Sequence, residues 1–118
     1  MSVKGIMNVE KFCKDNGVKI VLPEPRQLQL DIDSPKLPES YTEQLYILNQ
    51  INPVIREHTT TSKSGNLHVY IDLTNDITPV ERVLFQACMG SDIKRELLTY
   101  QNLLDSGNER PQFLFEKA

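Results

Sequence analysis

The chain has no tryptophan, few aromatic residues and no long apolar run. Without about 20 consecutive apolar residues we expect no membrane-spanning helix or secretion signal, and therefore a cytoplasmic protein. There are only two cysteines, Cys13 and Cys88, and no Cys-x-x-Cys spacing, so we expect two reduced thiols in the core. An excess of positive charge is also lacking. The net charge of −3 argues against a non-specific coat of nucleic acid, which needs many lysine and arginine contacts to phosphate.

Several catalytic signatures are missing as well. The chain has no P-loop, no dinucleotide-binding glycine fingerprint and no Ser-His-Asp pattern. Its 118 residues, of which 39% are hydrophobic, fit one domain (1–118) with a modest core.

The spacing of the apolar residues predicts alternating helices and strands. We expect helices over 8–16, 41–52, 79–89 and 93–104 and strands over 18–22, 27–33, 55–62, 67–73 and 112–115. Ser40 with Glu43 and Thr78 with Glu81 form two capping boxes at helix starts. The helical spacing predicts that the last two helices bury Val80, Val83, Leu84, Ala87, Cys88, Ile93, Leu97, Tyr100 and Leu104.

The central order of elements is strand, helix, strand, strand, helix. It predicts an α+β fold, a small antiparallel sheet with helices on one face and a ferredoxin-like or RNA-recognition-motif-like core. The other face of the sheet is expected to be at least partly open.

Strand 27–33 alternates strictly, which places Asp31 and Asp33 together on its polar face. Two carboxylates about 6–7 Å apart repel each other unless a cation lies between them. A hard cation such as Mg²⁺ or Mn²⁺ suits this pair and clamps nucleotide phosphates in phosphoryl transfer. Taken alone, the pair also fits two solvated residues at a strand end.

A second group of polar residues consists of His68, on the outward face of strand 67–73, and the turn before this strand. The turn before it, Ser62, Lys63, Ser64 and Gly65, offers hydroxyl, ammonium and backbone donors for a phosphate. Arg95, after Asp92, offers a further donor for a triphosphate or a template backbone. The alternatives are an ordinary hairpin with an exposed histidine and a solvated helix face.

Together these segments resemble the archaeo-eukaryotic-type primase-polymerases, particularly those of phages, plasmids and mobile elements. The first motif of that family is a strand ending in Asp-x-Asp, here 28–33, and the second is a Ser/Gly turn leading to a histidine, here 64–70. The third is an acidic residue, for which Asp92 within 90–93 is the candidate. Asn66 stands where a second turn glycine is common. The resemblance covers about residues 27–95 and indicates a minimal or truncated version of the domain.

The resemblance implies a two-metal site with Asp31, Asp33 and Asp92 as ligands of Mg²⁺ or Mn²⁺ and His68 contacting the incoming nucleotide. For Asp92, helix capping is an equally good interpretation. We therefore expect metal-dependent nucleotidyl transfer in the replication of a phage or mobile element. The partners would be a nucleoside triphosphate, a DNA or RNA template and a replication protein. A catalytically inactive nucleic-acid- or protein-binding module and a metal-dependent nuclease remain open as alternatives.

Overall fold

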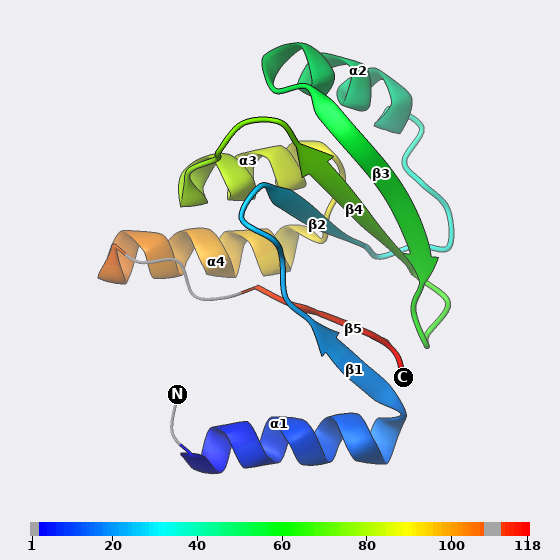
Figure 1. Cartoon of the computed structure of the whole chain (residues 1–118), viewed down its shortest axis with the longest axis vertical. Helices are drawn as coiled ribbons and strands as arrows, with labels where there is room; N and C mark the ends of the chain where they lie inside the picture. The colour runs from blue at the N-terminus through cyan, green and yellow to red at the C-terminus, as the bar shows by residue number, and fades with distance from the viewer. Residues whose placement is uncertain (1–2, 108–111) are drawn as a thin grey trace.

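The structure is a computed structural model that describes residues 3–107 and 112–118 (Figure 1). Its helices are α1 (Val3–Asn16), α2 (Tyr41–Ile51), α3 (Pro79–Cys88) and α4 (Ile93–Ser106). Its strands are β1 (Val18–Val21), β2 (Gln27–Ile32), β3 (Val54–Thr61), β4 (Leu67–Leu73) and β5 (Leu114–Lys117). Each of these elements was predicted from the sequence, with bounds that differ by a few residues.

The strands form two antiparallel sheets, which confirms the α+β class. The larger sheet has the order β2-β4-β3, and the smaller one pairs β1 with β5. The final strand therefore pairs with β1 near the other end of the chain instead of extending the larger sheet (Figure 1). In the described part of the chain, no helix is long and apolar enough to cross a membrane.

One face of the larger sheet carries the apolar core. Strands β2 and β4 alternate as the sequence predicts, and six of their inward side chains are at most 2% exposed: Leu28, Leu30, Ile32, Val69, Ile71 and Leu73. Tyr41 and Leu48 of α2, together with Met89 after α3, belong to the same buried cluster. These helices therefore cover the apolar face of the sheet.

The outer edge of β2 is covered by the corner between α3 and α4. Gln86 accepts a hydrogen bond from the backbone N–H of Gln29 at 3.0 Å. Ser91 Oγ accepts from the N–H of Asp31 at 3.0 Å, and the N–H of Asp92 donates to the Asp31 carbonyl at 2.7 Å. Side chains and a helix start thus satisfy backbone groups that would otherwise form an exposed sheet edge. Both backbone polar groups of Asp31 are fixed as a result.

A buried polar network supports this corner. Glu96 is only 1% exposed, and its carboxylate accepts hydrogen bonds from Gln86 Nε2 at 2.8 Å, Gln112 Nε2 at 3.1 Å and Ser91 Oγ at 2.8 Å. Gln112 also donates to Thr99 Oγ1 at 2.7 Å. Because each member has partners, burial of these polar groups is compensated.

The polar face of the larger sheet is covered at Gln29 and Tyr70 but exposed at Arg56 and His58 of β3, so it is partly open, in line with the expectation. Gln29 is 0% exposed and Tyr70 3% exposed, although both lie on that face. The Gln29 side chain donates to the carbonyl of Val21 in β1 at 3.0 Å. The β1–β5 sheet therefore packs against this polar face, and the core has a polar layer as well as an apolar one.

The structure corrects the predicted cap of α2 and the predicted buried faces of α3 and α4. Ser40 makes no side-chain capping bond, whereas the box of Thr78 and Glu81 is confirmed with both of its hydrogen bonds. Seven of the apolar side chains expected inside are exposed instead: Val80, Leu84, Cys88, Ile93, Leu97, Tyr100 and Leu104. On α4 the polar Glu96 and Thr99 are buried instead, because they face the network at the corner. Cys13 and Cys88 are both free thiols, as predicted, although Cys88 lies outside the core and Cys13 is half-buried.

Candidate functional site

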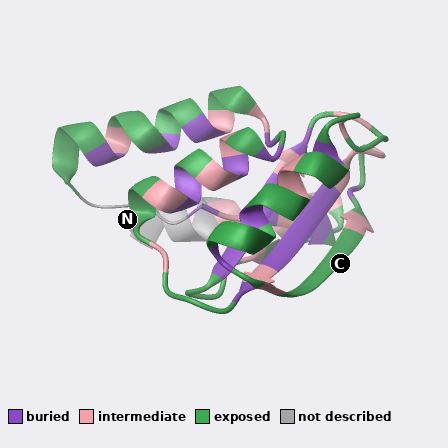
Figure 2. Cartoon of the chain, turned by 90° about the horizontal axis from the view of Figure 1, so that it is seen from above, coloured by how far each residue is buried: buried purple, intermediate pink, exposed green. Residues whose placement is uncertain are grey.

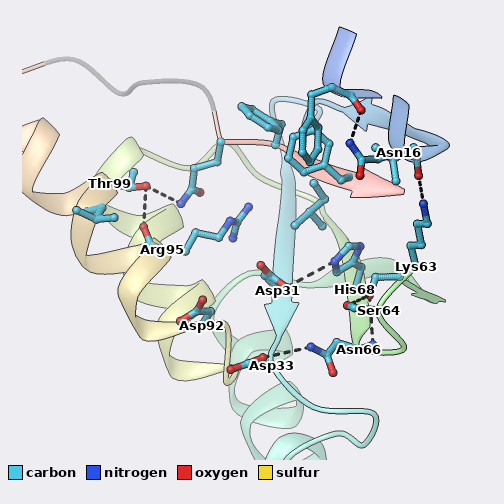
Figure 3. Close-up of a pocket in the computed structure, with 18 of the residues that line it drawn as sticks. Asn16, Asp31, Asp33, Lys63, Ser64, Asn66, His68, Asp92, Arg95 and Thr99 are labelled. Atoms are coloured by element: carbon cyan, nitrogen blue, oxygen red, sulfur yellow. Dashed lines mark hydrogen bonds and ion pairs between the residues drawn. The ribbon is translucent and has the colours of Figure 1, made fainter. Parts of the chain in front are cut away.

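A pocket of about 880 Å³ opens between the end of β2, the 62–66 turn, α4 and the segment leading into β5 (Figure 3). All but one of the site residues expected from the sequence line it: Asp31, Asp33, Ser62, Lys63, Ser64, His68, Asp92 and Arg95. Gly65 is the exception and shapes the turn beside the pocket. A volume of this size is within the usual range for small-molecule sites.

Asp31 and His68 face each other directly across β2 and β4. The Nε2 atom of His68 lies 3.5 Å from Oδ1 of Asp31. The carboxylate side chain is 34% exposed and the imidazole 7% exposed. The pairing thus presents an accessible carboxylate at the pocket and holds a buried ring directly beside it (Figure 3).

Glu116 holds the other side of the imidazole and was not anticipated from the sequence. Its Oε1 atom lies 2.7 Å from His68 Nδ1, while its Oε2 atom accepts from the Tyr70 hydroxyl at 2.7 Å and from the hydroxyl of Thr60. The expected strand ended at residue 115, one position before Glu116 and two before the end of β5. The available signal was the alternation of β5, in which Leu114 and Glu116 both face inward.

The surroundings favour a protonated His68. Burial alone would lower the pKa of the imidazole, but hydrogen bonds and charge attraction from Asp31 and Glu116 outweigh it and raise the pKa above its usual value. Burial would likewise raise the pKa of Glu116, but hydrogen bonds from Thr60, Tyr70 and His68 lower it. Burial and the bond to Glu116 raise the pKa of Tyr70, so its hydroxyl remains a donor.

The turn beside the pocket is held by its own side chains. Ser62 and Ser64 share a hydrogen bond of 2.9 Å, and the N–H of Asn66 donates to Ser62 Oγ at 3.2 Å. Only Gly65 in this turn has a positive φ, of 93°, so a non-glycine residue at 66 brings no strain. The Asn66 side chain donates to Asp33 Oδ1 at 3.2 Å, which links the turn to the second carboxylate.

Asp92 and Arg95 bring α4 to the pocket. Asp92 is the N-cap of α4 and accepts from the N–H of Lys94 at 3.1 Å, as the capping interpretation requires. Arg95 donates through one terminal nitrogen to the Gln29 carbonyl at 2.8 Å and to Glu96 at 2.7 Å. Its other terminal nitrogen is buried and has no hydrogen-bond partner within the described residues.

Lys63 lines the pocket on the side away from Arg95 and α4. Its ammonium group donates to the carbonyl of Asn16 at the end of α1 (Figure 3). The pocket therefore has an arginine on one wall and a lysine on another, and Asp31 and Asp33 also line its surface.

Residues 3–107 and 112–118 contain no group of three or more His, Cys, Asp or Glu side chains placed to hold a metal ion. The carboxylates of Asp31, Asp33 and Asp92 nevertheless line the same pocket. Their oxygen atoms fit Mg²⁺ or Mn²⁺, because such ions bind one or two protein carboxylates and take their remaining ligands from water and substrate phosphates. These three carboxylates could hold such an ion together with ligands that do not come from the protein.

Comparisons of the chain with protein-family models, with curated proteins and with solved structures found no match.

Proposed function

We propose that this pocket binds a nucleoside triphosphate together with Mg²⁺ or Mn²⁺ and that the protein transfers nucleotides in the manner of a primase-polymerase. The observation that carries the proposal is the convergence of three carboxylates and three cationic side chains on one pocket: Asp31, Asp33, Asp92, Lys63, His68 and Arg95. Carboxylates for an ion and cations for a polyphosphate are the two requirements of phosphoryl-transfer chemistry.

In this proposal Asp31 and Asp33 hold the ion, with Asp92 at the edge of the same site. The bound ion would supply charge neutralisation for the phosphate oxygens. Arg95 and Lys63 each contribute a positive charge at the wall of the pocket that attracts the phosphate groups. The fixed position of Asp31 at the covered edge of β2 keeps this arrangement in place without a ligand.

In this proposal His68 supplies positive charge, because Asp31 and Glu116 beside the imidazole raise its pKa. Its bond to Glu116 is 2.7 Å long, whereas its contact with Asp31 is 3.5 Å. The Nε2 N–H is therefore the more weakly held donor and the one available to a phosphate oxygen in the pocket. A donor fixed before the reaction stabilises charge that develops in the transition state without reorganisation.

The acceptor in this proposal is a DNA or RNA strand, extended during replication of a phage or mobile element with a replication protein as partner. It is supported by the likeness of residues 27–95 to three motifs of the primase-polymerases. Primer extension with a labelled nucleotide and Mn²⁺ tests it. Asp31→Asn, which keeps the shape and removes the charge, abolishes incorporation in our account. Asp72→Asn, on the same face of the sheet but outside the pocket, leaves it unchanged.

A second candidate is a catalytically inactive module that binds nucleic acid or protein. The net charge of −3, and the absence of a preformed three-ligand metal group in the described residues, favour it over catalysis. Such a module would bind an oligonucleotide equally well with and without Mn²⁺ and would incorporate no nucleotide. A wild-type protein with that behaviour refutes the enzymatic proposal. Cleavage of the strand in place of its extension would instead identify a nuclease.

A further inference from the structure

One apolar stripe on α4 has no partner within the described chain. Ile93, Leu97, Tyr100 and Leu104 are 56%, 58%, 40% and 68% exposed. Their spacing of four, three and four residues places them along one side of the helix, as in the seam of a helix pair. In Figure 2, α4 is the long helix at the upper left, and most of its outer surface is exposed. The neighbouring α3 leaves Val80 and Leu84 about half exposed as well.

The stripe is separate from the candidate site. On α4 the buried residues Glu96, Thr99 and Leu103 face the interior of the chain. Arg95 and Asn102 line the pocket. At 100° per residue, these two lie on the side of the helix opposite to the stripe. A partner on the stripe would therefore leave the pocket open.

We propose that the stripe binds the same stripe on a second copy of this chain, with the two α4 helices antiparallel about a two-fold axis. Such an axis brings Leu97 against Tyr100 of the second copy and Ile93 against its Leu104. Each of these contacts occurs twice, because the surface in a two-fold dimer is self-complementary. A 14-residue helix provides two heptads for this packing.

Charge on one flank of the stripe selects the antiparallel direction. Lys94 and Asp105 are both exposed and lie at opposite ends of α4 on the same flank. Antiparallel pairing places Lys94 of each copy near Asp105 of the other, which gives two attractive pairs. Parallel pairing about a two-fold axis would place these flanks on opposite sides of the dimer and would form neither pair.

The size of the surface also fits a dimer. The four stripe residues with Val80 and Leu84 present exposed apolar area on the order of 300–500 Å². This is comparable to the largest patch on a typical monomer, and such patches often mark interaction sites. The proposal does not depend on the function of the pocket.

Sedimentation velocity over a concentration series that reaches the high micromolar range tests the proposal. Wild-type protein should shift from monomer to dimer as its concentration rises. Leu97→Glu should remain monomeric, because it places a charge at the centre of the contact. Leu22→Glu is the matched control, since Leu22 is 59% exposed on another surface, and it should dimerise like wild type. A wild-type monomer at every concentration, or equal dimerisation of the two variants, would overturn the proposal.

Charge reversal tests the antiparallel direction independently of any effect of Leu97→Glu on folding. Lys94→Glu and Asp105→Lys should each weaken dimerisation by roughly tenfold, since each removes two ion pairs and creates two repulsions. The variant that carries both reversals should restore the wild-type dissociation constant. Single variants that dimerise normally, or a double variant that stays weakened, would contradict antiparallel pairing.

Discussion

The Nδ1 atom of His68 lies 2.7 Å from Oε1 of Glu116, a residue 48 positions away on the last strand. With Asp31 on the opposite side of the ring, the imidazole has a carboxylate beside each nitrogen. A protonated ring donates to both, so the pair of carboxylates fixes its orientation and its charge. The C-terminal strand therefore belongs to the candidate site through Glu116.

Replacing Glu116 should shift the titration of His68. Glu116→Gln removes the negative charge nearest to the ring, so the pKa of His68 should fall relative to wild type. The imidazole Hε1 resonance followed by NMR across a pH series measures this directly. Glu57→Gln removes an equal charge from an exposed strand position and should leave the resonance unchanged. An identical titration of His68 in wild type and Glu116→Gln would contradict the assigned role.

The same two groups should give the protein a stability that falls at both ends of the pH range. The pKa of His68 is raised above its usual 6.5, so its contribution is complete below 6.5 and is lost as the pH rises through the raised value. The pKa of Glu116 is lowered from 4.5, so its contribution is complete above 4.5 and is lost as the pH falls through the lowered value.

Urea unfolding at a series of pH values measures this dependence. The free energy of unfolding should be highest between the two transitions, and Glu116→Gln should flatten both slopes, since it removes one partner of each interaction. Slopes that are the same in wild type and variant would mean that other groups set the pH dependence.

The buried network at the corner of α3 and α4 should contribute strongly to stability. Gln86→Ala removes the partner of the Gln29 N–H and two donor contacts, to Glu96 and Gln112. Leaving such buried groups unsatisfied should lower the free energy of unfolding by about 2–4 kcal/mol. Chemical denaturation measures the change. Gln101→Ala, on the exposed side of α4, should change it by less than about 0.5 kcal/mol.

Two substitutions of Asp92 separate its capping role from its proposed role at the metal site. Asparagine caps a helix about as well as aspartate, so Asp92→Asn should keep the stability, whereas Asp92→Ala should lower it by about 1 kcal/mol. Both should weaken the binding of a nucleotide with Mn²⁺ if Asp92 is a ligand. Unchanged nucleotide affinity in Asp92→Asn would leave Asp92 with the capping role alone.

The residues of the candidate site that lie within local patterns could be predicted from the sequence. Strict alternation in β2 and β4 placed Asp31 and His68 on the same face, because strand periodicity depends only on neighbouring residues. Glu116 was missed because its contact with His68 depends on how β5 packs on a distant sheet. Gln86 and Glu96 were missed for the same reason, since burial of a polar side chain requires partners from other elements.

For the apolar stripe of α4, the sequence could predict the helix but not what this side of the helix packs against. The spacing of Ile93, Leu97, Tyr100 and Leu104 indicates a face that packs against something. It carries no information about whether the partner belongs to the same chain. In the structure a different side of α4 packs against the chain through the polar Glu96 and Thr99. The helix itself was predicted correctly, whereas its buried side was assigned to the wrong face.

Calorimetric titration of the protein with a nucleoside triphosphate, in the presence and absence of Mn²⁺, tests the central claim most directly. The account predicts saturable binding with Mn²⁺, much weaker binding without it, and loss of the Mn²⁺-dependent part in Asp31→Asn. Lys63→Glu should also weaken binding, whereas Lys14→Glu, a charge reversal outside the pocket, should not. Absence of binding with Mn²⁺, or an affinity that is the same with and without the ion, would contradict a metal–nucleotide site in this pocket.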